Sequence, residues 1–274
     1  MQVYGGAWTL IKLEVLEDYL SFYFKAMNRN TFKLCYIDAF AGSGNVNVRG
    51  IGEITGSVVR GLDYPFDRFI FIEKEQTYAN KLKEIISSRE KINARVEIGD
   101  CNELLKHLTA FQWHKNFWRG VIFLDPYAMN LNWVSLEVIA KTKAFDVWYL
   151  FPLSALNRVL RRDGKIDPKT QETITKLLGT EDWKNEIYYD SHQITLFGEQ
   201  DIERKSLDSI KSYIIRRLQS IFPGVADKAL ILRNPSNNSP LFLLCFAVSN
   251  PNIRAIDLSL RVANHILSHT FYKY

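Results

Sequence analysis

The stretch Leu-Cys-Tyr-Ile-Asp-Ala-Phe-Ala-Gly-Ser-Gly, residues 34–44, is a short apolar run that ends in an acid and then in two glycines. An apolar run of this length predicts a buried β-strand, and the glycines predict a turn directly after it. Because glycine carries no side chain, the backbone of such a turn can approach a ligand closely. The stretch therefore predicts a buried strand with a ligand site at its carboxyl end.

Runs rich in β-branched and aromatic residues alternate with helix-compatible segments along the first half of the chain. The predicted strands are 34–38, 68–73, 94–98, 120–125 and 145–151, and the predicted helices are 10–27, 76–88, 102–108 and 135–143. Strands that alternate with helices form a mostly parallel sheet covered by helices on both faces. The pattern predicts an α/β, Rossmann-like fold in which ligands bind beyond the carboxyl ends of the strands.

The second half of the chain is more polar and gives weaker patterns. It predicts a helix over 201–221, a buried strand over 240–248 and a last helix over 253–269. Segments 229–232 and 241–247 predict a C-terminal antiparallel hairpin that closes the sheet. We expect one domain over residues 1–274, with a helical elaboration around 155–228.

Composition excludes several classes of protein. The chain has 274 residues, 47% of them hydrophobic, and can bury a full core. Its apolar run 241–248 is too short to span a bilayer, and residues 1–6 lack the pattern of a signal peptide, so we expect a soluble, cytoplasmic protein with no membrane partner. The cysteines (Cys35, Cys101 and Cys245) and the five histidines lack the spacing of a disulfide framework or a metal site, so no metal is expected.

The formal net charge of +5 is compatible with an anionic partner. Basic residues gather in two sets, which are Arg158, Arg161, Arg162, Lys165 and Lys169, and Arg204, Lys205, Lys211, Arg216 and Arg217. A solvated helix face and a phosphate-binding surface both explain such sets. Nucleic acid, either DNA or RNA, is a partner that these charges allow.

The glycine turn departs from the dinucleotide fingerprint Gly-x-Gly-x-x-Gly, because Asn47 occupies the third glycine position. It has instead an acid, Asp38, four residues before Gly42. A carboxylate can accept hydrogen bonds from an ammonium group, and bare backbone at residues 42–44 can lie against a carboxylate or a sugar. This combination suits a zwitterionic amino-acid tail, although an ordinary glycine-rich turn explains it equally well.

Acids also end the next two predicted strands. Glu73 ends the run 68–73, where a carboxylate can bind both hydroxyls of a ribose. Asp100 follows the run 94–98, where a carboxylate can accept from the exocyclic amine of adenine. Each acid alone is typical of a strand end that faces water. Three of them at successive strand ends predict one shared site.

The fourth strand ends in Asp125-Pro126-Tyr127, which resembles the Asp-Pro-Pro-Tyr signature of methyltransferases that act on exocyclic amines. An aromatic amine is a poor nucleophile because its lone pair is delocalised into the ring. A carboxylate and a backbone carbonyl that accept from both N–H groups free the lone pair to attack a methyl group. Pro126 fixes the turn that aims the Asp125 carbonyl, and the Tyr127 ring offers a surface on which a flipped base can stack. A turn with an aromatic plug is the alternative interpretation.

The motifs, in this order, resemble class I S-adenosylmethionine-dependent methyltransferases of the adenine-N6 branch. More narrowly, the chain resembles the three-Cys-motif partner protein family over residues 8–160, and weakly over 241–250. The resemblance is carried by Trp8-Thr9 with Lys12, Tyr36 to Gly42, Gly56-Ser57, Phe71-Ile72-Glu73, Phe123 to Pro126, and Leu150-Phe151-Pro152 with Arg158. It implies S-adenosyl-L-methionine as cofactor and, from the family's name, a companion protein that bears a cysteine motif.

The resemblance also implies roles for single residues. The cofactor would be lined by Lys12, Asp38, Phe40, Gly42, Ser43, Gly44, Glu73, Asp100 and Cys101, with Trp8 and Lys12 closing over it, and Asp125, Pro126 and Tyr127 would act at the acceptor nitrogen. The chain departs from the adenine-N6 pattern in having one proline after Asp125 instead of two. It departs from the partner family in having Ala128-Met129 where a glycine is usual.

The leading hypothesis is a methyltransferase that acts on an exocyclic amine, with nucleic acid as the favoured acceptor. The alternative is a non-catalytic partner protein that keeps the cofactor fold to sense a nucleotide or to dock its companion. A nicotinamide-dependent oxidoreductase requires the glycine that Asn47 replaces. DNA, RNA, protein and a small amine all agree with the residues as acceptors.

Overall fold

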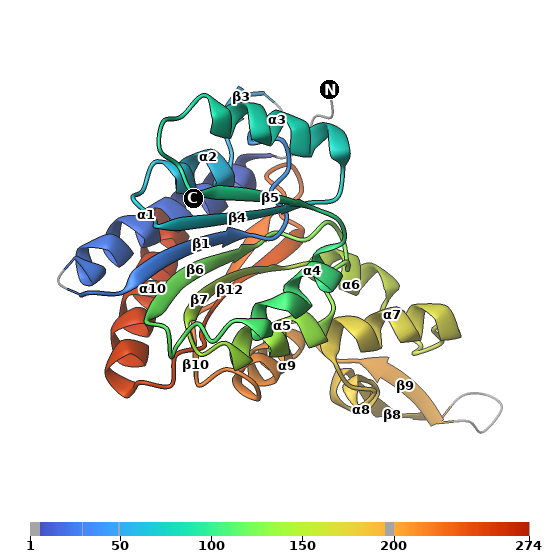
Figure 1. Cartoon of the computed structure of the whole chain (residues 1–274). Coiled ribbons are helices and arrows are strands. Elements are labelled where there is room, and N and C mark those ends of the chain that lie inside the picture. Colours follow the sequence, from blue (N-terminus) through green and yellow to red (C-terminus); the bar gives the residue numbers. More distant parts are fainter. Residues whose placement is uncertain (1–5, 29, 49, 195–199, 274) are drawn as a thin grey trace.

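A central sheet runs through the molecule in the order β10-β12-β7-β6-β1-β4-β5, and β11 also pairs with β12 (Figure 1). The computed structural model describes residues 6–28, 30–48, 50–194 and 200–273. Within them, the strands of this sheet are β1 (Lys33–Asp38), β4 (Arg68–Glu73), β5 (Ala94–Ile98), β6 (Trp118–Leu124), β7 (Phe145–Phe151), β10 (Gly224–Val225), β11 (Leu230–Arg233) and β12 (Pro240–Val248). Strands β1, β4, β5, β6 and β7 are parallel, whereas β12 is antiparallel to β7, β10 and β11.

The strands predicted from the sequence are confirmed. β4, β5, β7 and β12 have the predicted bounds. β1 begins one residue earlier than predicted, and β6 spans 118–124 instead of 120–125. The antiparallel pair of β11 and β12 is the predicted C-terminal hairpin, with Leu230 opposite Leu244. A mostly parallel sheet with an antiparallel strand next to its edge is the class I methyltransferase fold, as the sequence predicted.

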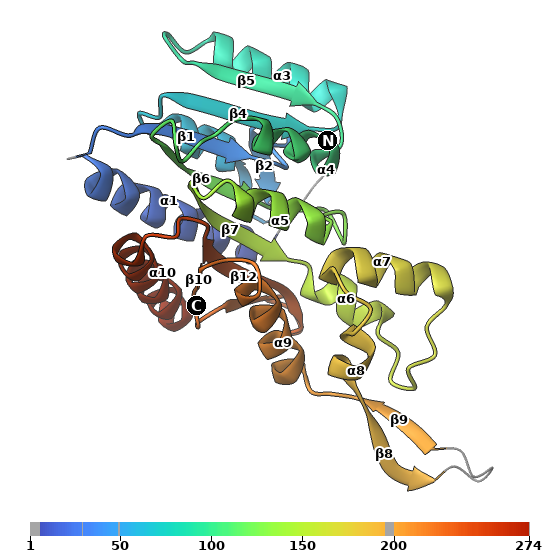
Figure 2. The ribbon, with the colours of Figure 1, turned by 60° about the horizontal axis from the view of Figure 1, so that its bottom comes forward.

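Helices cover both faces of the sheet (Figure 2). Alternate side chains of the inner strands enter two separate cores. On β7, Trp148 and Leu150 face one core, and Val147 and Tyr149 face the other. The first core is completed by α1 (Ala7–Met27), α2 (Ser57–Leu62), α3 (Gln76–Ser87) and α10 (Ile253–Lys273). The second is completed by α4 (Cys101–Leu105), the 3₁₀ helix η1 (Lys106–Ala110), α5 (Trp133–Lys141), α6 (Leu153–Val159), α7 (Pro168–Leu178), α8 (Trp183–Ile187) and α9 (Leu207–Gln219).

The helices α1 and α10 lie side by side on one face and are tied to the sheet through a buried carboxylate. Asp146 of β7 accepts hydrogen bonds from the Tyr19 hydroxyl of α1 at 2.7 Å and from the Ser259 hydroxyl of α10 at 3.3 Å. Burial raises the pKa of Asp146 to about 6. The Tyr19 ring packs against Trp148 and Phe246, with ring centroids 5.4 and 4.9 Å apart. The Asp146 carboxylate thus ties both helices to the sheet within an otherwise apolar layer.

A small hairpin separates the glycine turn from the helix that follows it. β2 (Asn45–Val48) and β3 (Gly52–Thr55) pair antiparallel, with Asn47 opposite Glu53. Helix α2 begins only at Ser57. The position where a dinucleotide fingerprint needs its third glycine therefore lies in a strand, which the sequence pattern did not predict.

The elaboration predicted around 155–228 holds α6 to α9 and also a two-stranded ribbon that projects from the body (Figure 2). β8 (Tyr188–Ile194) pairs antiparallel with β9 (Gln200–Arg204), with Tyr188 opposite Arg204. The helix predicted over 201–221 is wrong in its first part, because residues 200–204 belong to this ladder. Helix α9 begins after Ser206, whose hydroxyl accepts from the Ser209 N–H at 3.2 Å.

Among the described helices, none combines the length and apolar character that a membrane crossing needs. Residues 1–5, which the signal-peptide prediction concerns, lie outside the described residues.

Candidate functional site

The acids predicted at four strand ends come together along one edge of the sheet. Because β6, β1, β4 and β5 are neighbours in that order and run parallel, Asp125, Asp38, Glu73 and Asp100 follow one another at their carboxyl ends. The carboxyl edge is where ligands bind in sheets of this kind. The structure therefore gathers the predicted residues at one site.

Asp38 ends β1 and is completely buried. Its carboxylate accepts a short hydrogen bond from the Ser57 hydroxyl and one of 3.2 Å from the Phe40 N–H. Burial raises the pKa of Asp38 to about 7 against the opposing effect of these two donors; the charge of Asp125 adds to the rise and that of Lys12 opposes it. Asp38 thus holds the start of α2 against the glycine turn. A ligand's ammonium can reach it only if its surroundings open.

The glycine turn is held by Glu73. The Gly42 N–H donates to one carboxylate oxygen of Glu73 at 2.7 Å, and the Glu75 N–H donates to the other at 2.7 Å. Gly42 has a φ of +63°, in the left-handed region that favours glycine, and a Cβ there would meet no described atom within 4 Å. Because each carboxylate oxygen can accept a second hydrogen bond, Glu73 keeps acceptor capacity for a ligand's hydroxyls.

The other residues of the turn serve mainly to shape it. Phe40 is half-buried and packs against the core beneath the edge. The Ser43 hydroxyl donates to the Asn45 carbonyl at 3.2 Å, where β2 begins. A Cβ on Gly44 would approach Ile85 of α3 to 2.6 Å, so packing requires this glycine. Gly42, rather than Gly44, borders open space.

Asp100 and Cys101 stand at the start of α4. Asp100 is exposed and caps the helix, because its carboxylate accepts from the Asn102 N–H at 2.9 Å. Cys101 is buried, and burial together with the charge of Asp100 raises the pKa of its thiol to about 12. The thiol is therefore protonated near neutral pH. Within the described part of the chain, no group of three or more His, Cys, Asp or Glu side chains is placed to hold a metal ion.

The buried side chain of Asn102 connects α4 to the loop that follows Asp125. Its amide nitrogen donates to Asp100 at 3.1 Å and to the Asn130 carbonyl at 2.8 Å. Its oxygen accepts from the Asn132 N–H at 2.8 Å and from the Ser135 hydroxyl at 2.9 Å. All four hydrogen-bonding positions of the amide are filled, so this residue fixes the loop.

Asp125 follows β6 directly and is paired with a lysine from the first helix. The Lys12 ammonium forms a short ion pair with the Asp125 carboxylate. The side chain of Lys12 is 8% exposed and that of Asp125 is 24% exposed. The same ammonium lies 5.0 Å from the centre of the Trp8 ring, which packs against Phe242 of β12. Helix α1 thus reaches the carboxyl edge with both of the residues that the resemblance placed there.

The rest of the Asp-Pro-Tyr motif turns sharply away from the sheet. Pro126 is buried, whereas the Tyr127 side chain is 68% exposed. Ala128 has a φ of +51°, which is uncommon for any residue except glycine. This is the position near which the partner family was expected to have a glycine. The loop leaves the Tyr127 ring at the surface, beside Asp125 in sequence.

Ser57 and Asn102 shape this edge although sequence analysis assigned them no individual role, and Thr9 is a polar residue buried in the first turn of α1. Ser57 donates to Asp38, and Asn102 fixes the loop after Asp125. Thr9 is 1% exposed, and its hydroxyl has no hydrogen-bond partner among the described residues. Ser57 is the first residue of a helix and follows a glycine, and Asn102 stands two residues after the acid that caps α4. Both positions are typical of side chains that hydrogen-bond near a helix start, so the sequence could have indicated them. Thr9 left no signal beyond its own place in the resemblance, next to Trp8.

Much of the second basic set is structural. Arg204 donates to the carbonyl oxygens of Asn157 and Leu160 at 3.1 and 2.8 Å, which ties β9 to α6. Arg217 donates to the Leu178 carbonyl at 3.0 Å. These side chains donate to backbone carbonyls and hold the elaboration together, which explains their positive charge without a bound phosphate.

The first basic set is more exposed. Arg158 lies on the surface of α6, directly after the carboxyl end of β7, and Arg162 and Lys165 follow it. Arg161 pairs with Asp163 at 3.0 Å, and both side chains are largely exposed. Arg158 thus lies near the carboxyl end of β7, whereas the Tyr188 hydroxyl of β8 donates to the Arg161 carbonyl at 2.8 Å, which places Arg161 beside the ribbon.

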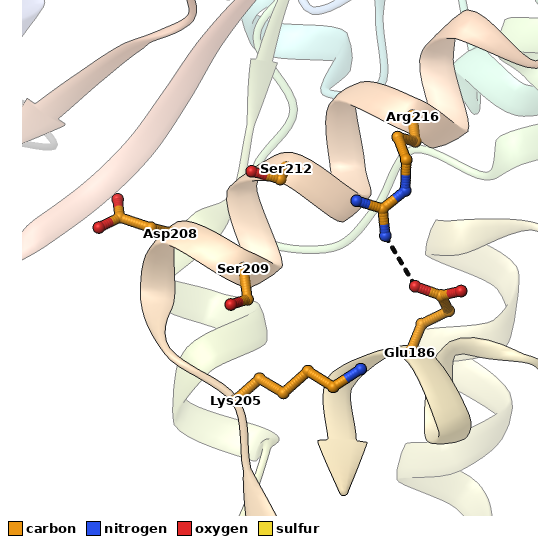
Figure 3. Close-up of a pocket in the computed structure, with 6 residues that line it drawn as sticks. All are labelled: Glu186, Lys205, Asp208, Ser209, Ser212 and Arg216. Carbon is orange, nitrogen blue, oxygen red and sulfur yellow. Dashed lines mark hydrogen bonds and ion pairs between the residues drawn. The ribbon is translucent and has the colours of Figure 1, made fainter.

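Two hollows on the described surface lie away from the strand ends. One, of about 390 Å³, opens between α8 and α9 and is lined by Glu186, Lys205, Asp208, Ser209, Ser212 and Arg216, with Arg216 and Glu186 paired at 2.7 Å (Figure 3). The other, of about 570 Å³, lies beside Ser249, which bonds to Phe145 at the start of β7. Neither hollow is lined by a predicted site residue. At the strand ends themselves, Asp38 is buried and Asp125 is paired with Lys12.

No family model and no curated protein matches the chain. Among solved structures, protein LPL1258 from Legionella pneumophila str. Philadelphia 1, of the family model DUF519, is 13% identical with a TM-score of 0.55, over 96% of this chain and 92% of that chain. The putative methyltransferase yhhF from Escherichia coli is 12% identical with a TM-score of 0.34, over 68% and 85%. The plantazolicin methyltransferase BamL, crystallised with a triazolic desmethylPZN analog and SAH, is 10% identical with a TM-score of 0.38, over 88% and 85%. The likeness to LPL1258 concerns the fold alone, and the other two align too loosely to inform the site.

Proposed function

We propose that the chain is an S-adenosylmethionine-dependent methyltransferase that acts on an exocyclic amine of nucleic acid. The observation that carries the proposal is the row of acids at the carboxyl ends of adjacent strands, which are Asp125, Asp38, Glu73 and Asp100. Each acid stands at the strand end where the resemblance expects it. The sheet that carries them has the methyltransferase fold.

The residues of the edge fit the chemistry of S-adenosylmethionine. Glu73 keeps acceptor capacity for ribose hydroxyls, and open backbone at Gly42 suits a carboxylate or a sugar. Asp100 is exposed and can accept from the adenine amine. The buried Thr9 hydroxyl has unused hydrogen-bonding capacity that a polar ligand would satisfy. When bound, the cofactor supplies a methyl group already activated by its sulfonium, so the protein needs no nucleophile of its own.

Asp125 then acts on the acceptor. Its carboxylate and backbone carbonyl accept hydrogen bonds from the two N–H groups of the amine, which localises the lone pair on nitrogen. Pro126 holds the turn that aims these acceptors, and the exposed Tyr127 ring stacks on the base. The proton that the amine loses passes to Asp125 or to water.

Two further observations support the finer parts of the proposal. The exposed cation Arg158 lies on the helix that follows β7 at its carboxyl end, where a phosphate backbone could lie beside the site. We also propose that the chain belongs to the three-Cys-motif partner family and works with a cysteine-motif companion. Membership is supported by contacts between motif segments that lie far apart in the chain. Lys12 pairs with Asp125, and Ser57 donates to Asp38.

The ion pair on Asp125 also favours a second candidate, a non-catalytic partner protein. A carboxylate whose charge is neutralised by Lys12 accepts more weakly from an amine than a free one does. If the pair stays closed in the liganded chain, the site binds cofactor without turnover and serves as a sensor or a docking module. Cofactor binding together with the absence of methyl transfer distinguishes this candidate.

Calorimetry with S-adenosylmethionine and S-adenosylhomocysteine, followed by tritiated methyl transfer to RNA, DNA and adenine-containing oligonucleotides, tests the proposal. We expect the unaltered chain to bind both ligands and to label nucleic acid. Asp125→Asn should keep its affinity for S-adenosylhomocysteine within a few-fold and lose at least about 100-fold in transfer rate. Asp63→Asn, which breaks only an exposed pair with Arg89, is the matched control. Binding of neither ligand would refute the enzyme, and binding without any transfer would favour the partner protein.

A further inference from the structure

Lys12 is a buried cation that stands within reach of two acids. Its ammonium is paired with Asp125, and its charge lowers the pKa of Asp38 on the neighbouring strand. A buried ammonium is costly unless carboxylates compensate for the lost water. The junction between the ends of β1 and β6 is therefore a built position for a positive charge.

A cationic group of a ligand would compete with Lys12 for the charge of these two acids. Asp38 is completely buried and already accepts from Ser57 and Phe40, and Asp125 is paired with Lys12. The cofactor of the proposed function carries two positive groups, an ammonium and a sulfonium. A third cation at the same junction would repel them, because like charges in a partly desolvated site interact strongly.

The attachment of α1 allows the lysine to leave. The N-cap of α1 is Gly6, which provides no side-chain cap for the first turn. Within that turn the Thr9 hydroxyl is buried without a partner among the described residues, so the closed arrangement leaves a hydrogen bond unmade. The Lys12 side chain can therefore exchange its partner without disturbing a capping interaction.

We propose that Lys12 is a place-holder cation: its ammonium occupies, in the ligand-free chain, the position beside Asp125 and Asp38 that the sulfonium of the cofactor takes over. This inference rests on the proposed function, because it needs the cofactor to bind at this edge. Binding of S-adenosylmethionine then displaces the Lys12 ammonium from Asp125. Because a sulfonium donates no N–H hydrogen bond, the carboxylate oxygens stay available to the acceptor amine.

The two forms of the cofactor give a direct readout of this exchange. S-adenosylmethionine carries a sulfonium, whereas S-adenosylhomocysteine has a neutral thioether and is otherwise alike. A resident cation at the junction weakens binding of the sulfonium form selectively. A lysine that contacts a group shared by both ligands would instead affect the two affinities equally.

The experiment is calorimetric measurement of both dissociation constants for the unaltered chain, Lys12→Met, Asp125→Asn and the double variant. We expect the ratio of the S-adenosylmethionine constant to the S-adenosylhomocysteine constant to fall at least about fivefold in Lys12→Met and to rise at least about fivefold in Asp125→Asn. The double variant should return to within about twofold of the unaltered chain, because the junction is again neutral. Lys25→Met, on an exposed position of the same helix, should leave the ratio unchanged.

An unchanged ratio in Lys12→Met, with both constants raised together, would overturn the place-holder role while leaving the proposed function intact. If Lys12→Met does not fold, judged by its circular dichroism, the Asp125→Asn arm decides alone, since an unchanged ratio there also overturns the inference. An unaltered chain that binds neither ligand overturns both the inference and the proposed function.

Discussion

The Gly42 N–H donates a hydrogen bond of 2.7 Å to the Glu73 carboxylate, which joins the turn after β1 to the end of the neighbouring strand β4. The second oxygen of Glu73 accepts from the Glu75 N–H. One side chain thereby sets the conformation of two loops at the same edge. The turn is shaped by the protein itself, and its shape depends on a single carboxylate.

Glu73→Gln tests that dependence. The amide offers only one acceptor oxygen, so one of the two backbone N–H groups loses its partner, and we expect the free energy of unfolding to fall by about 1–3 kcal/mol. Affinity for S-adenosylhomocysteine should fall about tenfold as the turn loosens. Urea denaturation and calorimetry measure the two effects. Glu75→Gln, which changes an exposed side chain, should change neither, and equal losses in both variants would contradict this assignment.

Alanine substitutions at two glycines allow the cost of backbone strain to be measured separately from the effect of contact with the ligand. Gly42 and Gly50 have φ values of +63° and +81°, and a Cβ on either would meet no described atom within 4 Å. Each substitution by alanine should cost about 1–2 kcal/mol of stability through left-handed strain. Only Gly42→Ala should weaken binding of S-adenosylhomocysteine, because its new methyl group enters the site. Matching affinities for the two variants would show that Gly42 does not border the ligand.

Asn102→Ala should destabilise the protein far more than the loss of a single hydrogen bond. It leaves the Asn130 carbonyl, the Asn132 N–H and the Ser135 hydroxyl without their partner, and we expect a loss of about 2–4 kcal/mol. Ser135→Ala removes one of these bonds and should cost about 1 kcal/mol. Urea denaturation of both variants makes the comparison. Similar costs would mean that Asn102 does not hold the loop after Asp125.

Stability should decrease as pH rises through the weakly acidic range. Burial raises the pKa of Asp38 to about 7 and that of Asp146 to about 6, from an ordinary value of 3.8. Below about pH 4 both groups are mostly protonated in the folded and in the unfolded chain. Between about pH 4 and the folded pKa of each group, the unfolded chain has released a proton that the folded chain retains. The free energy of unfolding therefore falls as pH rises through this range.

Asparagine variants identify the groups responsible. Asp146→Asn should remove the part of this slope up to about pH 6, and Asp38→Asn the part up to about pH 7, so each variant gains stability relative to the unaltered chain as pH rises. Urea denaturation at several pH values between about 4.5 and 7.5 measures the slopes. A slope that both variants leave untouched would exclude these carboxyls as its cause.

The parts of the fold that could be predicted from sequence are those in which local pattern and tertiary environment agree. Residues 69–72 of the strand 68–73 form a continuous apolar run that ends at Glu73. The strand lies between two other strands, so its pattern matched its position. The acids at the strand ends followed from the same argument, because parallel strands finish at the same edge.

The remaining features depend on partners that local pattern cannot reveal. Residues 200–204 continue a polar, helix-compatible run, and only pairing with β8 makes them a strand. The donation of Ser57 to Asp38 and the pairing of Lys12 with Asp125 join segments 19 and 113 residues apart. No periodicity in the sequence predicts contacts between residues so far apart in the chain. The resemblance placed Lys12 near the cofactor, but its engagement with the acid at the acceptor required the folded chain.

The buried contacts of Asp146 bear on folding kinetics. Tyr19 and Ser259 reach this carboxylate from 127 and 113 residues away along the chain, so the junction forms only after long loops have closed. We expect Asp146→Ala to accelerate unfolding while leaving the refolding rate nearly unchanged, as stopped-flow measurements in urea would record. An equal slowing of refolding would place the junction in the transition state. If refolding is unchanged, the contacts of Asp146 with α1 and α10 set the lifetime of the native state and not the rate at which the chain folds.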